Sequence, residues 1–260
     1  MKRNLLQPKK YPIKTVCLLL VLIFARDTIS AQTLKVAVAA NLQGVIKVLQ
    51  QDFMQKTNIQ IDPIVGSSGN LSNQIKNGAP YSVFLSADMN FPNELYKSGF
   101  TTSKPVVYAL GSLIICSNQN LNFNHWEKLL LADQIKKIAL ANPATAPYGK
   151  AATEVLQRKT LLPKIQPKIV YGESIAQVNI YITTGVAEIG FTTEALVTDV
   201  ANKQKIYWQR VPAADYQPIE QGMVIIKQAN ANLQQAEKFY QYLQSASAKT
   251  ILKKYGYRTK

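Results

Sequence analysis

The sequence predicts an α/β protein in which helices alternate with the strands of mainly parallel sheets. Short runs rich in β-branched residues recur along the chain, and stretches with apolar residues at helical spacing separate them. Of the 260 residues, 47% are apolar and 17% are charged, which excludes a disordered chain, a collagen and a disulfide scaffold. This length allows one large domain or two modest ones, so a two-lobed protein is compatible with it.

The β-branched runs predict eight strands. From the N-terminus onward they cover residues 34–39, 59–65, 83–86, 113–117, 137–141, 168–171, 189–193 and 223–227. The clearest helix is predicted over 41–56, where apolar residues recur at three- and four-residue steps: Leu42, Val45, Ile46, Leu49 and Phe53. The same spacing predicts a helix over 233–243, and a second short helix over 246–254 follows it.

Residues 1–31 have the layout of a secretory signal peptide. A basic start is followed by a ten-residue apolar run, Val16–Ala25, and then by small and polar residues up to Ala31. Ten apolar residues are too few to span a bilayer, which needs about 20 in a helix, so a retained membrane anchor is the less favoured alternative. We expect cleavage near Ala31 and export of about 229 residues.

The charge that remains after this cleavage bears on the partners of the protein. Without residues 1–31 the chain has 24 basic and 14 acidic residues, a net charge of +10. Such a charge can attract nucleic acid or a membrane surface. The basic residues are scattered, however, and the two Trp and 13 Tyr are dispersed, so no nucleic-acid partner is expected. We expect the charge to steer small anions instead.

The residue types that enzymes and metal centres use are scarce. The single histidine, His125, lies in a polar turn and is expected at the surface. Cys116 has no partner once Cys17 leaves with the signal peptide, and is expected to be a small buried apolar residue. The sequence contains no zinc-ligand spacing, no Walker phosphate loop and no Gly-x-Ser-x-Gly motif. We therefore predict no catalytic residue, no metal-cation ligand and no cofactor.

Four predicted strands end in a small or polar turn that leads into a helix. These turns are Ala39–Asn41, Gly66–Asn70, Pro143–Gly149 and Gly172–Ser174. Each one exposes main-chain N–H groups at a helix N-terminus, which Asn and Ser also cap, so simple capping explains any single turn. Gly66–Asn70 has more donors than a cap needs and is typical of an anion nest. Because open α/β folds bind ligands at the carboxyl ends of their strands, the turns together predict an anion site.

With these turns, the sequence resembles the periplasmic molybdate-binding proteins, the substrate-binding components of molybdate/tungstate ABC transporters. The matching segments, in order, are residues 36–42, 66–71, 75–88, 141–149, 172–175 and 239–257. Each segment alone is a weak signal, but their order and spacing are specific, and the resemblance spans essentially all of residues 33–260.

The resemblance implies a type II periplasmic-binding-protein fold, with two lobes that are each a mainly parallel sheet flanked by helices. The first lobe would comprise residues 32–109 and 225–260, and the second lobe residues 110–224. The implied hinge lies at the two crossings between the lobes, near 108–111 and 222–224.

The resemblance also implies the residues that hold a tetrahedral oxyanion. Asn41 and Ser68 would bind it from the first lobe through main-chain N–H and side chain, and Tyr148 and Ile175 from the second lobe through main-chain N–H. Many members carry a tyrosine donor where this chain has Phe191–Thr193. Thr193 is therefore expected to supply a shorter hydroxyl.

The chemistry of these turns fits an anion whose oxygens only accept hydrogen bonds. No Lys or Arg lies in the turns at Asn41, Ser68 and Ile175, and Lys150 is the nearest basic residue. Fixed neutral dipoles suffice for such an anion. Protonated phosphate would need an acceptor, which Glu173 would supply if it pointed inward; we expect it to face solvent.

We therefore predict an exported, periplasmic, monomeric binding protein, not an enzyme, that captures molybdate, and tungstate as well, and delivers it to an ABC permease. Two alternatives stay open. One is a binder of sulfate or another tetrahedral oxyanion on the same fold, and the other is an exported enzyme with Ser67 or Ser68 as nucleophile.

Overall fold

The computed structural model describes residues 33–199 and 204–259. The predicted signal peptide, residues 1–31, lies outside the described residues. Within the described ranges, no helix is long and apolar enough to cross a membrane.

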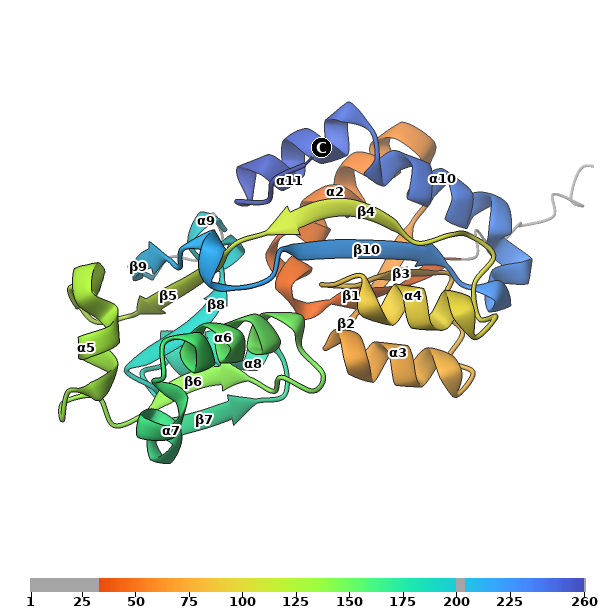
Figure 1. The fold of residues 1–260 in the computed structure, drawn as a ribbon. Coiled ribbons are helices and arrows are strands. Elements are labelled where there is room, and N and C mark those ends of the chain that lie inside the picture. Colours follow the sequence, from red (N-terminus) through yellow and green to blue (C-terminus); the bar gives the residue numbers. More distant parts are fainter. Residues whose placement is uncertain (1–32, 200–203, 260) are drawn as a thin grey trace, which may run out of the picture. The chain divides into compact units, whose positions relative to one another are not determined.

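Two five-stranded sheets organise these residues (Figure 1). The first sheet has the order β2-β1-β3-β10-β4. Its strands are β1 (Leu34–Ala39), β2 (Ile61–Gly66), β3 (Val83–Leu85), β4 (Val106–Gly111) and β10 (Ile219–Ile225). β1 runs parallel to β2 and β3, whereas β10 is antiparallel to both β3 and β4. Four strands of this sheet therefore share one direction.

Helices cover both faces of the first sheet (Figure 1). One face carries α2 (Gln43–Thr57), α10 (Leu233–Leu243) and α11 (Ala246–Lys254), and the other carries α3 (Ser68–Lys76) and α4 (Asn90–Lys97). The period of two along β1 sorts its residues between these faces, because successive side chains of a strand point to opposite sides. Val36 and Val38 pack with α2, and Ala37 packs with α3.

The second sheet repeats this plan. Its order is β7-β6-β8-β5-β9, with β6 parallel to β7 and β8, and β5 antiparallel to β8 and β9. The strands are β5 (Leu113–Ser117), β6 (Ile138–Ala141), β7 (Ile169–Gly172), β8 (Ile189–Thr193) and β9 (Tyr207–Arg210). The helices are α5 (Trp126–Leu131), α6 (Pro147–Arg158), α7 (Leu162–Ile165), α8 (Ile175–Thr183) and α9 (Ala195–Thr198).

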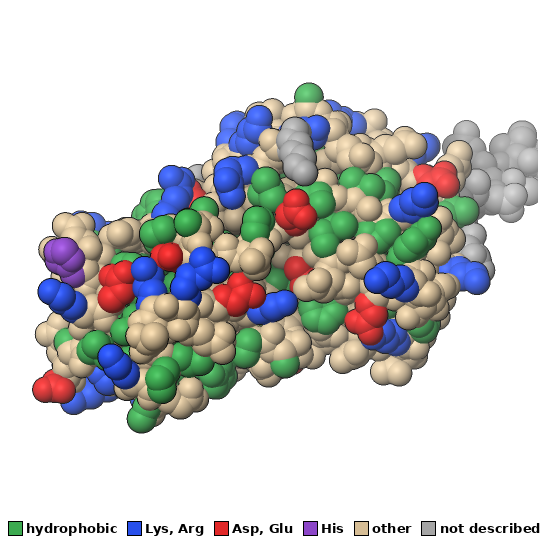
Figure 2. All heavy atoms as spheres, viewed as in Figure 1, with side chains coloured by type: hydrophobic (Ala, Val, Ile, Leu, Met, Phe, Trp, Pro, Cys, Tyr) green, Lys and Arg blue, Asp and Glu red, His purple; other side chains and the backbone are tan. Residues whose placement is uncertain are grey.

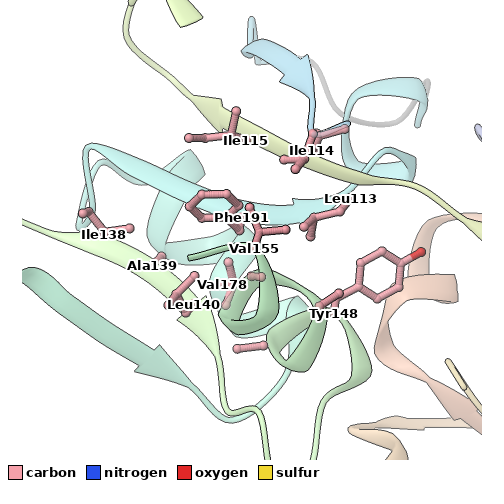
Figure 3. Packing of buried hydrophobic residues seen from close by; sticks show 14 of the residues in the cluster. Leu113, Ile114, Ile115, Ile138, Ala139, Leu140, Tyr148, Val155, Val178 and Phe191 are labelled. Atoms are coloured by element: carbon pink, nitrogen blue, oxygen red, sulfur yellow. The ribbon is translucent and has the colours of Figure 1, made fainter. Parts of the chain in front are cut away.

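A single apolar core joins the second sheet to its helices (Figure 3). Phe191 of β8 lies at its centre and meets the Trp126 ring edge-on, with 5.7 Å between ring centroids. Cys116 is fully buried in the same core, and burial raises the pKa of its thiol. His125 is exposed. Both of these residues therefore lie where the sequence predicts.

Short 3-10 turns complete the described structure. They are η1 (Ala40–Leu42), η2 (Phe123–His125), η3 (Gln166–Lys168), η4 (Ala213–Asp215) and η5 (Lys227–Asn232).

The chain crosses between the sheets twice. β4 of the first sheet ends at Gly111 and β5 of the second begins at Leu113, so Ser112 joins the two. The chain returns between Arg210, where β9 ends, and Ile219, where β10 begins. The predicted lobe limits stay a prediction. Because β10 pairs along its length within the first sheet, we propose that the return crossing precedes Ile219 and does not lie near 222–224.

Candidate functional site

A small cavity lies where four of the predicted residues meet. Its walls are Ala39, Ala40, Asn41, Ser67, Ser68, Ala87, Ala146, Pro147, Tyr148 and Ile175. These residues come from the carboxyl ends of β1, β2, β3, β6 and β7 or from the helices that follow, which is the edge where α/β sheets hold ligands. The cavity volume is about 10 Å³, close to what one water molecule needs. A tetrahedral oxyanion is larger, so the walls have to move apart to take it.

Main-chain donors at this cavity come from helix starts. Ser68 and Ile175 are the first residues of α3 and α8, and Tyr148 is the second residue of α6, after Pro147. N–H groups at these positions have no acceptor within their own helix. The helix dipoles add positive potential at the same points. The arrangement therefore attracts an anion without a cationic side chain.

The described cavity wall has no charged side chain. None of the described residues that line it is Lys, Arg, Asp, Glu or His. Lys150 is exposed and lies in an adjacent crevice with Asp88 and Glu154. The described residues also contain no group of three His, Cys, Asp or Glu side chains that could hold a metal ion. This arrangement suits a ligand with acceptor oxygens and does not suit a bare cation.

Ser67 and Ser68 have different functions at the start of α3. Ser67 is the N-cap, and its hydroxyl accepts from the Asn70 N–H at 3.4 Å. The buried Ser68 hydroxyl accepts from the Ala87 N–H at 3.0 Å, which fixes its orientation and leaves its own hydrogen to donate. A nucleophilic serine needs a base within hydrogen-bond reach. The described cavity wall supplies none, so its geometry does not favour the serine-enzyme alternative.

Asn41 is held from behind by other side chains. Its Nδ2 donates to Gln221 Oε1 at 3.0 Å and to the Tyr257 hydroxyl at 3.1 Å. The same hydroxyl donates to the Asn41 carbonyl oxygen at 2.7 Å. Among the described residues, Asn41 Oδ1 has no hydrogen-bond partner. The amide hydrogens are thus engaged, and the side-chain contact predicted for Asn41 would require this amide to turn.

Tyr148 lines the cavity, but its hydroxyl points elsewhere. Figure 3 shows the ring directed away from the apolar side chains of the second lobe. The hydroxyl accepts from Gln221 Nε2 and from the Thr193 hydroxyl, both at 3.2 Å. Burial raises the pKa of Tyr148 well above its ordinary value, so the phenol stays neutral. The residue can offer its main-chain N–H to an anion while its side chain anchors the start of α6.

Thr193 is the predicted site residue that the structure does not bring to the cavity wall. Its hydroxyl donates to Tyr148 and accepts from the Ala195 N–H at 3.3 Å. It lines a neighbouring groove of about 370 Å³ together with Asn41 and Lys47. Contact between Thr193 and an anion stays a prediction; the geometry gives the residue a part in orienting Tyr148.

The lobes also meet at the rim of the cavity. The Gly69 N–H in α3 donates to the Thr145 carbonyl oxygen at 2.9 Å, and Asn70 Nδ2 donates to Glu173 Oε1 at 2.5 Å. Glu173 is exposed, as expected, and does not line the cavity. These bonds join α3 of the first lobe to turns of the second at the rim of the cavity.

Sequence reasoning missed the side chains behind the cavity, namely Tyr108, Gln221 and Tyr257. All three are buried and bond to one another or to Asn41 and Tyr148. No clear signal marked Gln221, because it follows Glu220 in β10 and the pair looks like a solvent-exposed polar segment.

Comparison with known proteins agrees with this geometry. The model of a family described as bacterial extracellular solute-binding protein matches residues 34–258. The chain belongs to this family, and its two lobes have the fold that the sequence predicts.

Individual relatives within this class are named as molybdate-binding proteins. The molybdate-binding protein ModA of Azotobacter vinelandii is 35% identical over 228 residues, which cover 87% of this chain and 90% of the relative. The ModA protein of Rhodobacter capsulatus is 34% identical over 224 residues, covering 86% and 87%. The solved structure of the Azotobacter vinelandii periplasmic molybdate-binding protein matches with a TM-score of 0.83 at 35% identity, over 87% of this chain and 99% of that one. The predicted resemblance to the periplasmic molybdate-binding proteins is thereby confirmed.

Proposed function

We propose that this protein captures molybdate, and tungstate as well, between its two lobes and delivers it to the membrane permease of an ABC transporter. The observation that carries the proposal is the neutral cavity at which helix starts from both lobes converge: Ser68 from one side, Tyr148 and Ile175 from the other. Relatives at 34–35% identity named as molybdate-binding proteins support it. The protein acts in the periplasm as a monomer after loss of the signal peptide, without a cofactor and without catalysis.

The physical basis is the match between a dianion and fixed neutral donors. Molybdate carries four oxygens that only accept hydrogen bonds, and main-chain N–H groups at helix starts donate to such oxygens without a counter-charge. The permease receives the loaded form, in which the anion is enclosed between the two lobes.

Other oxyanions differ from molybdate in size or in protonation. Sulfate is smaller and has the same acceptors, so discrimination against it rests on how far the walls separate. Phosphate near neutral pH carries a proton and needs an acceptor. Glu173 bonds to Asn70 outside the cavity wall, so no carboxylate among the described lining residues accepts the proton of phosphate.

Calorimetric titration of the purified protein with molybdate, tungstate, sulfate and phosphate tests the proposal. We expect strong binding of the first two anions and much weaker binding of the others. Preference for sulfate or phosphate would replace the proposed ligand, and absence of binding to all four would refute the proposed function.

A further inference from the structure

A buried hydrogen-bond network lies behind the cavity and includes side chains of both lobes. Its members are Asn41, Tyr108, Gln221 and Tyr257 on the side of the first sheet, and Tyr148 and Thr193 on the side of the second. Two of them, Asn41 and Tyr148, also line the cavity, from opposite lobes. The network therefore connects the two halves of the site by a route that does not pass through the ligand.

Gln221 joins the two halves directly. This residue of β10 is fully buried. Its Oε1 accepts from Asn41 Nδ2 at 3.0 Å and from the Tyr108 hydroxyl at 2.9 Å. Its Nε2 donates to the Tyr148 hydroxyl at 3.2 Å. One carboxamide thus bonds to a cavity residue of each lobe.

The packing around Gln221 is shaped to admit this arrangement. A Cβ atom added at Gly111 would lie 2.1 Å from the Tyr148 hydroxyl oxygen and 2.9 Å from Gln221 Nε2. Only a residue without a side chain leaves room there for the phenol to reach the carboxamide. A buried carboxamide also costs free energy unless its polar atoms are paired, and an apolar side chain would serve the sheet at less cost.

We propose that Gln221 is a positioning residue that couples the two half-sites and thereby tightens anion binding. It holds the start of α6 through the Tyr148 hydroxyl and the η1 turn through the Asn41 amide. The main-chain N–H groups of these two segments therefore keep fixed positions relative to each other. A displacement of either half is passed to the other. The inference rests on the proposed function, because it assigns Gln221 to the same anion site.

A double-mutant cycle tests this coupling. The variants are Gln221→Met, Tyr148→Phe and the pair, and molybdate affinity is measured by calorimetry. Tyr148→Phe removes the hydroxyl but keeps the main-chain N–H, so it reports on positioning alone. We expect each single variant to bind about tenfold more weakly, a typical coupling between sites. The double variant should lose no more molybdate affinity than the single variant that binds more weakly, because both changes break the same bond.

The control is Gln217→Met, at an exposed position before β10 whose main-chain N–H bonds to Glu154. It should bind molybdate as the parent protein does. Stopped-flow kinetics give a readout that lost stability alone would not produce, since loose positioning of the bound state raises the dissociation rate and leaves association almost unchanged.

Each outcome decides the inference. Single variants that bind like the parent refute it, even if they unfold at lower temperature, and strictly additive losses refute the coupling. If Gln221→Met does not fold, Gln221→Asn takes its place in the cycle, because its neutral carboxamide is one methylene shorter and cannot bond to both Asn41 and Tyr148. If the parent prefers another of the four anions, the proposed ligand fails and the cycle is run with that anion; if it binds none of the four, both proposals fail.

Discussion

Gly69 lies at a contact between the two lobes, and its replacement tests whether this contact is needed for binding. A Cβ atom at Gly69 would lie 2.9 Å from Thr145 Cα, 3.1 Å from Thr145 Cβ and 3.2 Å from the Phe91 ring. Ordinary contacts of this kind begin near 3.4 Å. The Thr145 backbone would therefore have to retreat by about half an ångström, and the 2.9 Å bond between the Gly69 N–H and the Thr145 carbonyl would weaken or break.

The energetic consequences of Gly69→Ala have opposite signs for folding and for binding. Loss of one hydrogen bond costs roughly 0.5–1.5 kcal/mol, and the lobe displacement also moves Ser68, so we expect an affinity loss of about tenfold or more. Stability of the unliganded protein should stay equal or rise, because alanine favours a helix over glycine by roughly 1 kcal/mol and the open form relieves the clash.

Calorimetry with molybdate and thermal unfolding without it measure both effects. Asn73→Ala, an exposed change in the same helix, is the control: alanine favours the helix there as well, but the affinity should stay unchanged. Unchanged affinity in Gly69→Ala would show that the contact between Gly69 and Thr145 is not part of the binding-competent form. Loss of stability without anion would show that the contact belongs to the fold and not to closure.

Three further outcomes follow from the same structure. Ser68→Ala should weaken molybdate binding by roughly 1.5–3 kcal/mol, the range for a hydrogen bond to a charged group, and an unchanged affinity in calorimetry would remove the hydroxyl from the site. Burial raises the pKa of Tyr108, Tyr148 and Tyr257, so the folded protein keeps these protons to a higher pH than the unfolded chain does. Their contribution to the free energy of unfolding is therefore fully present below about pH 10 and is lost as the pH rises above it. Urea unfolding at several alkaline pH values should show this decline, and Tyr148→Phe should make it shallower. The association rate of molybdate should fall with added salt while the dissociation rate changes little, because distant positive charges act on the approaching anion; a salt-independent association rate in stopped-flow experiments would exclude such steering.

The predicted fold agrees with the structure where the local pattern is strong. The strands at 34–39, 113–117 and 189–193 have the predicted bounds, and each is fully or largely buried. Two strands were missed, β4 and β9, and both lie at the edge of a sheet. An edge strand such as β9, with alternating exposed and half-buried residues, needs less apolar character, so its sequence resembles a loop.

The structure brings four of the five predicted site residues to one cavity, and their binding of an anion stays a prediction. Asn41, Ser68, Tyr148 and Ile175 meet because parallel strands end at one edge of each sheet, a rule that holds without knowledge of distances. The network behind them could not be predicted this way. Its bonds join residues up to 216 positions apart, and only the packed structure shows that Gln221 reaches both lobes.

The surface charge is dispersed. On the face shown in Figure 2, Lys and Arg side chains are interspersed with acidic and neutral ones. A dispersed positive charge supports the proposal of a small anionic ligand over a polyanionic partner.

The place of β10 in the first sheet has a consequence for the order in which the chain acquires structure. This strand lies between β3 and β4, although it comes more than a hundred residues after them. During synthesis, β4 therefore has no neighbour until Ile219–Ile225 has been made, whereas all five strands of the other sheet lie between Leu113 and Arg210. We expect a fragment of residues 112–211 to show cooperative unfolding by circular dichroism, and one of residues 33–111 to show none; the opposite result would mean that the first three strands suffice as a nucleus.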